Sequence, residues 1–132
     1  MSHTYDSNYT PPFPVLPIIL HNSKKELSVS CQKAHLDTGA DSTIIPHTLL
    51  DKIESEEIDI NYIQSHWGER RQISVHSIDI EVDGEYLSAI EVVRDDVGKE
   101  ILIGRNVLNR LIILLDGFKN QADVLTRRPQ KF

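Results

Sequence analysis

The sequence predicts an all-β domain folded as a small closed barrel with one or two short helices. Apolar and polar residues alternate over 27–32, which is the period of a half-buried strand. Asp83-Gly84 separates two apolar runs and is typical of a two-residue hairpin turn. About seven or eight short apolar runs divided by turn residues follow one another along the chain, a pattern typical of barrels.

Length and composition indicate one globular domain. The chain has 132 residues, 39% of them hydrophobic and 26% charged. We expect a folded domain over 13–126, a flexible N-terminal segment over 1–12, and a basic C-terminal tail over 127–132.

Charge and cysteine content exclude several functions and compartments. The formal net charge of −6 argues against nucleic-acid binding, which needs a cationic surface. No apolar run approaches the ~20 residues that span a bilayer, and the N-terminus lacks the pattern of a signal peptide, so we expect no membrane partner. Cys31 is the single cysteine, which favours a reducing compartment and a cytoplasmic location.

The first half of the chain contains two predicted strands and a helix. Residues 15–20 form a short apolar run, which Pro17 restricts to an edge strand because proline has no N–H to donate. The alternating strand that begins at 27 continues through 34–36 with core-like residues. After Pro46, apolar residues at helical spacing predict one short helix.

The second half contains the predicted hairpin and the last strands. Apolar residues change from odd to even positions along 73–82, so we expect a bulge or bend near His76-Ser77. Residues 101–104 are typical of a short buried strand and are followed by one helical turn. Residues 111–125 predict a buried strand, a turn and a final short strand.

The stretch HLDTGADSTIIP, residues 35–46, places an acid at the end of a buried strand. Leu36 has the character of a core residue, so the carboxylate of Asp37 is partly desolvated unless something holds it. Gly39 can donate its backbone N–H to that carboxylate, and without a Cβ it allows another chain to come close. Ala40 leaves the same edge unobstructed. An ordinary turn after a strand also favours Asp and Gly, so this motif alone does not decide between the two interpretations.

A second motif, ILIGRN at 101–106, again ends an apolar strand in glycine. With both motifs the sequence resembles the retroviral-type aspartic proteases, the retropepsins. In that family an apolar-apolar-Asp-Thr-Gly-Ala motif carries the catalytic aspartate, and a later apolar-apolar-Gly-Arg-Asn/Asp segment packs beneath it. The resemblance covers roughly residues 15–125. The run GRNVLNRL followed by LLDG is closer to the stand-alone cellular relatives than to the viral enzymes.

The resemblance implies an acid-protease-like barrel with one flap hairpin and a role for each residue of the first motif. Asp37 is the expected catalytic residue. Thr38 would direct its hydroxyl to the loop of a partner subunit, Gly39 would bond the substrate backbone, and Ala40 completes the active-site loop.

The second motif is expected to support that loop from below through Ile103, Gly104 and Asn106. An ion pair between Asp41 and Arg105 would keep the two motif loops in register, because a guanidinium favours a planar carboxylate acceptor. The alternative is that these are two exposed charges that do not meet.

The sequence departs from the family pattern in two places. The viral flap is rich in glycine, whereas the expected flap segment here offers only Trp67 and Gly68 as candidates. Trp67 either lies over substrate or fills the core. The hairpin after Gly117 differs from the short viral terminus, which leaves open how a dimer edge is built.

Peptide hydrolysis by this chemistry needs two carboxylates that face one water, one ionised and the other protonated. The chain has one Asp-Thr-Gly motif and no internal repeat, while Asp83-Gly84 and Asp116-Gly117 are typical turns. A two-fold homodimer must therefore supply the second acid, and the monomer should be inert.

We expect an aspartic-type endopeptidase that acts on peptides or proteins without a metal or cofactor. The six histidines lack metal-ligand spacing, and Cys31 is expected to be a small buried hydrophobic residue rather than a nucleophile. One alternative is a catalytically silent dimeric binding or scaffold module with the same fold. Another is a dedicated processing enzyme that trims one partner or its own precursor.

Overall fold

The computed structural model describes residues 1–64 and 68–130. Within these residues the strands are β1 (Ser2–Thr4), β2 (Val15–Asn22), β3 (Leu27–Leu36), β4 (Thr43–Pro46), β5 (Glu57–Gln64), β6 (Arg70–Val82), β7 (Glu85–Asp95), β8 (Ile101–Ile103), β9 (Ile112–Asp116) and β10 (Gln121–Leu125). The helices of this part of the chain are α1 (His47–Lys52) and α2 (Arg105–Leu108). None of its helices is long and apolar enough to cross a membrane.

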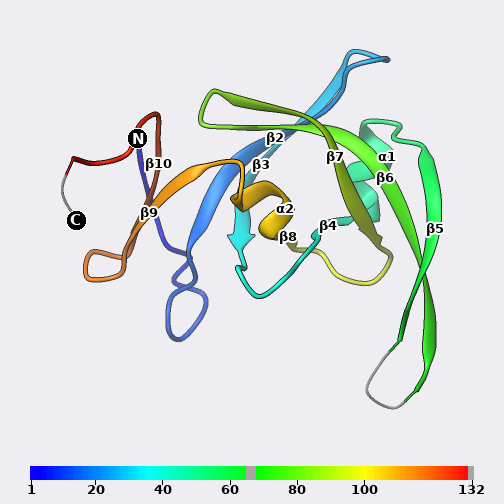
Figure 1. Ribbon diagram of the computed structural model, residues 1–132, viewed down its shortest axis with the longest axis horizontal. Helices are drawn as coiled ribbons and strands as arrows, with labels where there is room; N and C mark the ends of the chain where they lie inside the picture. The colour runs from blue at the N-terminus through cyan, green and yellow to red at the C-terminus, as the bar shows by residue number, and fades with distance from the viewer. Residues whose placement is uncertain (65–67, 131–132) are drawn as a thin grey trace.

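The larger sheet closes into a barrel (Figure 1). Its strand order is β2-β3-β8-β4-β7-β6-β5, and a further pairing between β2 and β6 joins the two ends of the first six strands. The barrel interior is filled by aliphatic side chains, of which Leu20, Ile45 and Ile80 have no exposed surface. The predicted all-β barrel with short helices is confirmed.

The smaller sheet consists of β1, β10 and β9 in that order. β1 pairs with β10 through Ser2↔Asp123 and Thr4↔Gln121, so the segment expected to be a flexible extension lies within the fold. Its polar composition gave no sign of this, because the partner strand comes from the far end of the chain. β9 is not the buried strand predicted, since Leu114 and Leu115 are 41% and 47% exposed.

β2 is an interior strand of the barrel, so the prediction of an edge strand is wrong. It pairs with β3 on one side and with β6 on the other. Pro17 lies where the β2–β3 register shifts, between Leu16 and Ile18, and the β2–β6 pairing begins only at Ile18. Proline is tolerated there because the ladder is already interrupted at that point.

Asp83 and Gly84 form the predicted turn between β6 and β7, with φ angles of 47° and 82°. The predicted irregularity near His76 is also present. The adjacent residues Val75 and His76 are both buried, so the buried positions change from odd to even residue numbers along β6. Opposite them the β5–β6 register shifts between Glu57 and Asp59, so the extra residue belongs to β5 rather than to β6.

The hairpin of β5 and β6 projects beyond the barrel (Figure 1). Among the described strands, β5 pairs with β6 alone, and β6 gains its second neighbour, β7, only from Val75 onward. We refer to residues 57–64 and 70–74 as the arm. Gly68 is exposed with a φ of 82°, whereas Trp67 lies outside the described residues.

Candidate active site

The strand order brings the two sequence motifs together. β8 lies between β3 and β4, the strands that flank the loop containing Asp37. β3 and β8 run parallel, with Leu36 opposite Ile103. The backbone N–H of Asp37 then donates to the carbonyl oxygen of Ile103 at 2.9 Å, which continues this ladder by one residue. The end of β8 therefore fixes the backbone of Asp37.

The Asp37 carboxylate is held by its own loop. Gly39 donates its backbone N–H to Oδ1 of Asp37 at 2.8 Å, the interaction expected from the sequence. A Cβ on Gly39 would lie 3.1 Å from that same oxygen, so glycine permits the approach. Asp37 is half-buried, while Thr38 and Gly39 are exposed. The carboxylate is thus oriented and still accessible to water.

Gly104 lets the second motif lie directly under the first. A Cβ built on Gly104 would fall 2.3 Å from the carbonyl oxygen of Ser42 and 2.6 Å from its carbonyl carbon. Real side chains do not reach backbone atoms at such distances, so this contact requires glycine. The next residue, Arg105, donates its backbone N–H to the carbonyl of Ala40 at 2.8 Å.

A buried threonine joins the two motifs through hydrogen bonds. Thr43 has no exposed surface, and its hydroxyl oxygen accepts from the backbone N–H of Gly104 at 3.1 Å. The same hydroxyl donates to Oδ1 of Asn106 at 2.7 Å, and Nδ2 of Asn106 donates to the carbonyl of Glu91 at 2.8 Å. The sequence does not single out Thr43, because threonine is common in strands whether or not it is buried.

The predicted ion pair between Asp41 and Arg105 is absent from the described residues. Nη1 of Arg105 donates instead to the carbonyl oxygen of Thr38 at 2.7 Å. Asp41 and Arg105 are both exposed. An exposed carboxylate keeps its hydration and gains little from such a pair, which is consistent with the guanidinium bonding a loop carbonyl instead. Arg105 still connects the two motifs, through a different acceptor.

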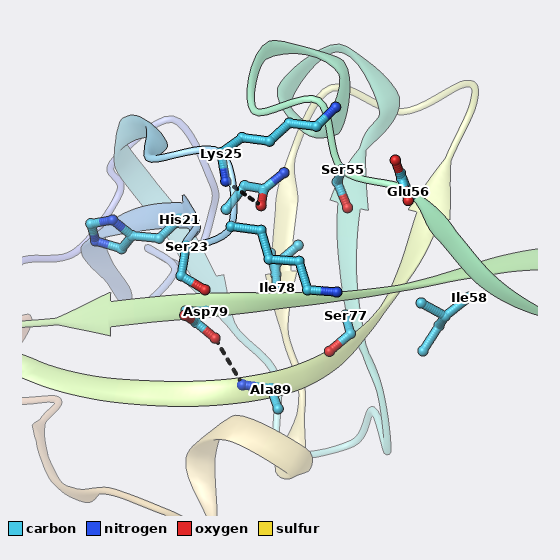
Figure 2. Close-up of a pocket in the computed structure, with 12 residues that line it drawn as sticks. His21, Ser23, Lys25, Ser55, Glu56, Ile58, Ser77, Ile78, Asp79 and Ala89 are labelled. Carbon is cyan, nitrogen blue, oxygen red and sulfur yellow. Dashed lines mark hydrogen bonds between the residues drawn. The ribbon is translucent and has the colours of Figure 1, made fainter.

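Other candidate chemistry finds no support in the described chain. Cys31 is half-buried, and burial raises the pKa of its thiol, which disfavours the nucleophilic thiolate. No three His, Cys, Asp or Glu side chains among the described residues are grouped to hold a metal ion. The cavity in Figure 2, of about 300 Å³, is lined by residues such as His21, Lys25 and Asp79 and does not include Asp37.

Comparison with known proteins gives matches among solved structures alone. No protein-family model matches the chain, and no curated protein matches it significantly. The protease of simian foamy virus (mac) superposes with a TM-score of 0.53 at 23% identity, covering 72% of this chain and 91% of the viral one.

Two non-viral structures cover more of the chain. The retroviral protease-like domain of Ddi1 from Leishmania major has a TM-score of 0.54 at 16% identity, covering 87% of this chain and 90% of that one. A retropepsin-like aspartic protease from Rickettsia conorii has a TM-score of 0.51 at 15% identity, covering 83% and 90%. The chain therefore has the fold of retroviral and retropepsin-like proteases, and the resemblance seen in the sequence is confirmed at the level of the fold.

Proposed function

We propose that this chain is an aspartic-type endopeptidase that hydrolyses peptide bonds with a water held between Asp37 of two subunits. The observation that carries this proposal is the Asp37 carboxylate, which accepts the Gly39 N–H at 2.8 Å on a half-exposed loop. The loop belongs to a fold that the chain shares with retroviral and retropepsin-like proteases. The single cysteine of the sequence favours action in a reducing compartment such as the cytoplasm.

The chemistry divides two roles between two identical acids. The ionised carboxylate accepts a proton from water as the water oxygen attacks the peptide carbonyl carbon, and the protonated carboxyl donates to the carbonyl oxygen. The resulting tetrahedral intermediate breaks its C–N bond as the leaving amine takes the proton that the first carboxylate accepted from water. The other carboxylate regains a proton from a hydroxyl of the intermediate, which restores both acids. Two adjacent carboxylates share one proton at low cost, because ionising both would place like charges together.

A second copy of the chain supplies the second acid. One chain contains one Asp-Thr-Gly, and a two-fold axis beside the loop brings its symmetry mate opposite. Thr38 is exposed on this loop, which suits a contact with the loop of the partner. The exposed backbone of Gly39 is placed to bond the substrate, and the β5–β6 hairpin, with Trp67 and Gly68 as candidates for its tip, would cover it.

The test combines a cleavage assay with a mass measurement in dilute solution. Wild type and Asp37→Asn are compared on a mixed peptide library, and both are analysed by sedimentation. We expect two dimers, of which only the wild type cleaves. Asp116→Asn is the matched control, since Asp116 also precedes a glycine and accepts a turn N–H, from Lys119 at 3.1 Å; this variant should cleave normally.

Two results would contradict the proposal. Cleavage by Asp37→Asn at the wild-type rate would assign the activity to other residues. Absence of cleavage in the dimeric wild type on every peptide would favour a silent binding or scaffold module.

A further inference from the structure

The arm joins the barrel at one point, and His76 lies there. Residues 70–74 of β6 pair with β5 alone, whereas Val75 and His76 also pair with β7. The described residues of β5 up to Tyr62 are exposed, while His76 is 3% exposed. A hairpin with few buried contacts opens locally at low cost, so the contacts at its base decide how firmly it is held.

A continuous series of hydrogen bonds crosses the base of the arm through His76. Its Nδ1 lies 2.9 Å from the hydroxyl of Ser55, just before β5, and its Nε2 lies 3.2 Å from the hydroxyl of Ser74. The Ser74 hydroxyl donates to Oε2 of Glu57 at 2.6 Å. These bonds connect both strands of the arm to a single buried imidazole.

A neutral imidazole satisfies every bond of this series. The Ser74 hydroxyl uses its proton on Glu57, so its oxygen accepts from Nε2–H of His76. In this Nε2–H tautomer, Nδ1 accepts from the hydroxyl of Ser55. Every group in the series is satisfied when His76 carries one proton. A second proton on Nδ1 would reverse this bond, so that the Ser55 hydroxyl oxygen accepts, and would place a positive charge on a side chain that is only 3% exposed.

The charges around His76 come from three elements besides β6. Arg94 of β7 donates to Asp51 of α1 at 3.0 Å and to Asp96, just after β7, at 2.8 Å. Burial is the largest effect on the pKa of His76 and lowers it, and the Arg94 cation lowers it further, while Glu57, Asp51 and Asp96 act in the opposite direction. The balance is a pKa below the ordinary 6.5.

We propose that His76 is a pH-sensitive switch at the base of the β5–β6 hairpin, which neutral His76 holds to the barrel and protonated His76 releases. A polar cavity of about 450 Å³, lined by Ser55, Ser74, His76 and Arg94 among others, lies beside this series of hydrogen bonds and gives water a route to the imidazole. The inference concerns the hairpin itself and does not depend on the proposed cleavage activity.

The direction in which pH changes the closure of the arm follows from the lowered pKa of His76. When the arm opens, His76 enters water and regains its ordinary pKa of 6.5, so the open state binds the proton more tightly. Closure is therefore fully favoured above pH 6.5 and weakens as the pH falls through the lower pKa of the closed state. Protection of the arm should drop about tenfold for each pH unit that separates the two pKa values.

The experiment is NMR on the full-length chain. The imidazole of His76 is titrated, and amide protection factors, which remove the intrinsic pH dependence of exchange, are measured along the arm at about pH 5 and about pH 7.5. In the wild type we expect a His76 pKa below 6.5 and lower protection of the arm in acid. His76→Gln, which hydrogen-bonds without titrating, should abolish the change. His3→Gln, in β1, should leave it intact, because His3 contacts Asp83 in the turn beyond the opposite end of β6.

Arg94→Gln tests the same proposal without altering the imidazole. Removing this cation and freeing two carboxylates should move both the His76 titration and the loss of protection to higher pH together. The proposal is overturned by an arm whose protection does not change with pH in the wild type, or by a loss that persists in His76→Gln. If His76→Gln does not fold, a midpoint that stays fixed in Arg94→Gln overturns it instead.

Discussion

At the scale of single residues, small side chains determine the geometry around Asp37. Gly39 allows a backbone N–H to reach the Asp37 carboxylate, and Gly104 allows the second motif to approach Ser42. Gly117 differs from both, because a Cβ there would meet nothing within 4 Å. Adding the same methyl group at each of these three glycines should therefore change the free energy of unfolding by different amounts.

Gly104→Ala should lower the free energy of unfolding by about 1–3 kcal/mol, the usual cost of forcing an extra methyl group into a packed site. The physical reason is the 2.3 Å approach of the new Cβ to the Ser42 carbonyl oxygen, a backbone atom that cannot rotate away. Urea denaturation measures the change. Gly117→Ala is the control and should remain within about 0.5 kcal/mol of wild type. Equal losses in the two variants would contradict this account of Gly104.

The residues of the site differ in how far the sequence revealed them. Asp37 and Gly39 were identified because their types and spacing have a direct chemical meaning, and the structure brings them together as expected. Thr43 was missed, since the burial of one polar residue leaves no periodic signal. Arg105 was correctly placed near the first motif but was assigned the wrong acceptor, Asp41, because the sequence does not show which oxygen of the loop an exposed guanidinium bonds.

At the scale of elements, the N-terminal segment is fastened to β3 next to the candidate active site. Asp6 is 4% exposed and accepts hydrogen bonds from the Asn8 N–H at 3.1 Å, from Lys33 at 3.3 Å and from His35 at 3.1 Å. His35 lies two residues before Asp37 and makes edge-on contacts with the rings of Tyr9 and Phe13. The segment thus braces the end of β3.

Asp6→Asn should lower the melting temperature at neutral pH, because the amide cannot replace an anion bonded to three donors. The Asn8 N–H is the largest cause that lowers the pKa of Asp6 below its ordinary 3.8, followed among the lowering causes by His35 and Lys33. Stability from Asp6 is therefore present above pH 3.8 and lost as the pH falls through the lower folded-state pKa.

Melting curves of the two proteins across this pH range test the prediction. The difference between wild type and Asp6→Asn should shrink as the pH falls below 3.8, and it should disappear below the lower folded-state pKa, where Asp6 is protonated in both the folded and the unfolded chain. Glu85→Gln, a neutralised exposed acid in the β6–β7 hairpin, is the control and should melt like wild type. If the difference in melting temperature stays constant down to the lowest pH, the loss of stability comes from packing and not from the charge of Asp6.

Elements defined by local pattern were predicted, and those defined by distant partners were not. The β6–β7 hairpin follows from Asp83-Gly84, and α1 follows from apolar spacing after Pro46. The interior position of β2 depends on its pairing with β6, about sixty residues later in the chain, which no local pattern records. β1 similarly depends on β10.

At the scale of the whole molecule, one chain presents half of the proposed site. It has one Asp-Thr-Gly, on a loop that leaves Asp37 half-exposed. Among the described residues, the hydrogen-bond partner of that carboxylate is the Gly39 N–H, and no second acid bonds to it. The proposed activity must therefore depend on how many pairs of intact chains form, rather than on the number of intact chains.

Mixing wild type with Asp37→Asn at constant total concentration shows whether activity follows the number of intact pairs or the number of intact chains. If subunits exchange freely, a fraction f of wild-type chains forms active pairs in proportion to f², so an equal mixture should retain about a quarter of the activity. Independent monomers would retain about half, because each intact chain would work alone. Peptide cleavage is measured after a long incubation, with Gly117→Ala as the control partner, which should cause no loss. Once the subunits have exchanged, a linear fall with f would overturn the shared site, since it would show that a single Asp37 suffices for hydrolysis.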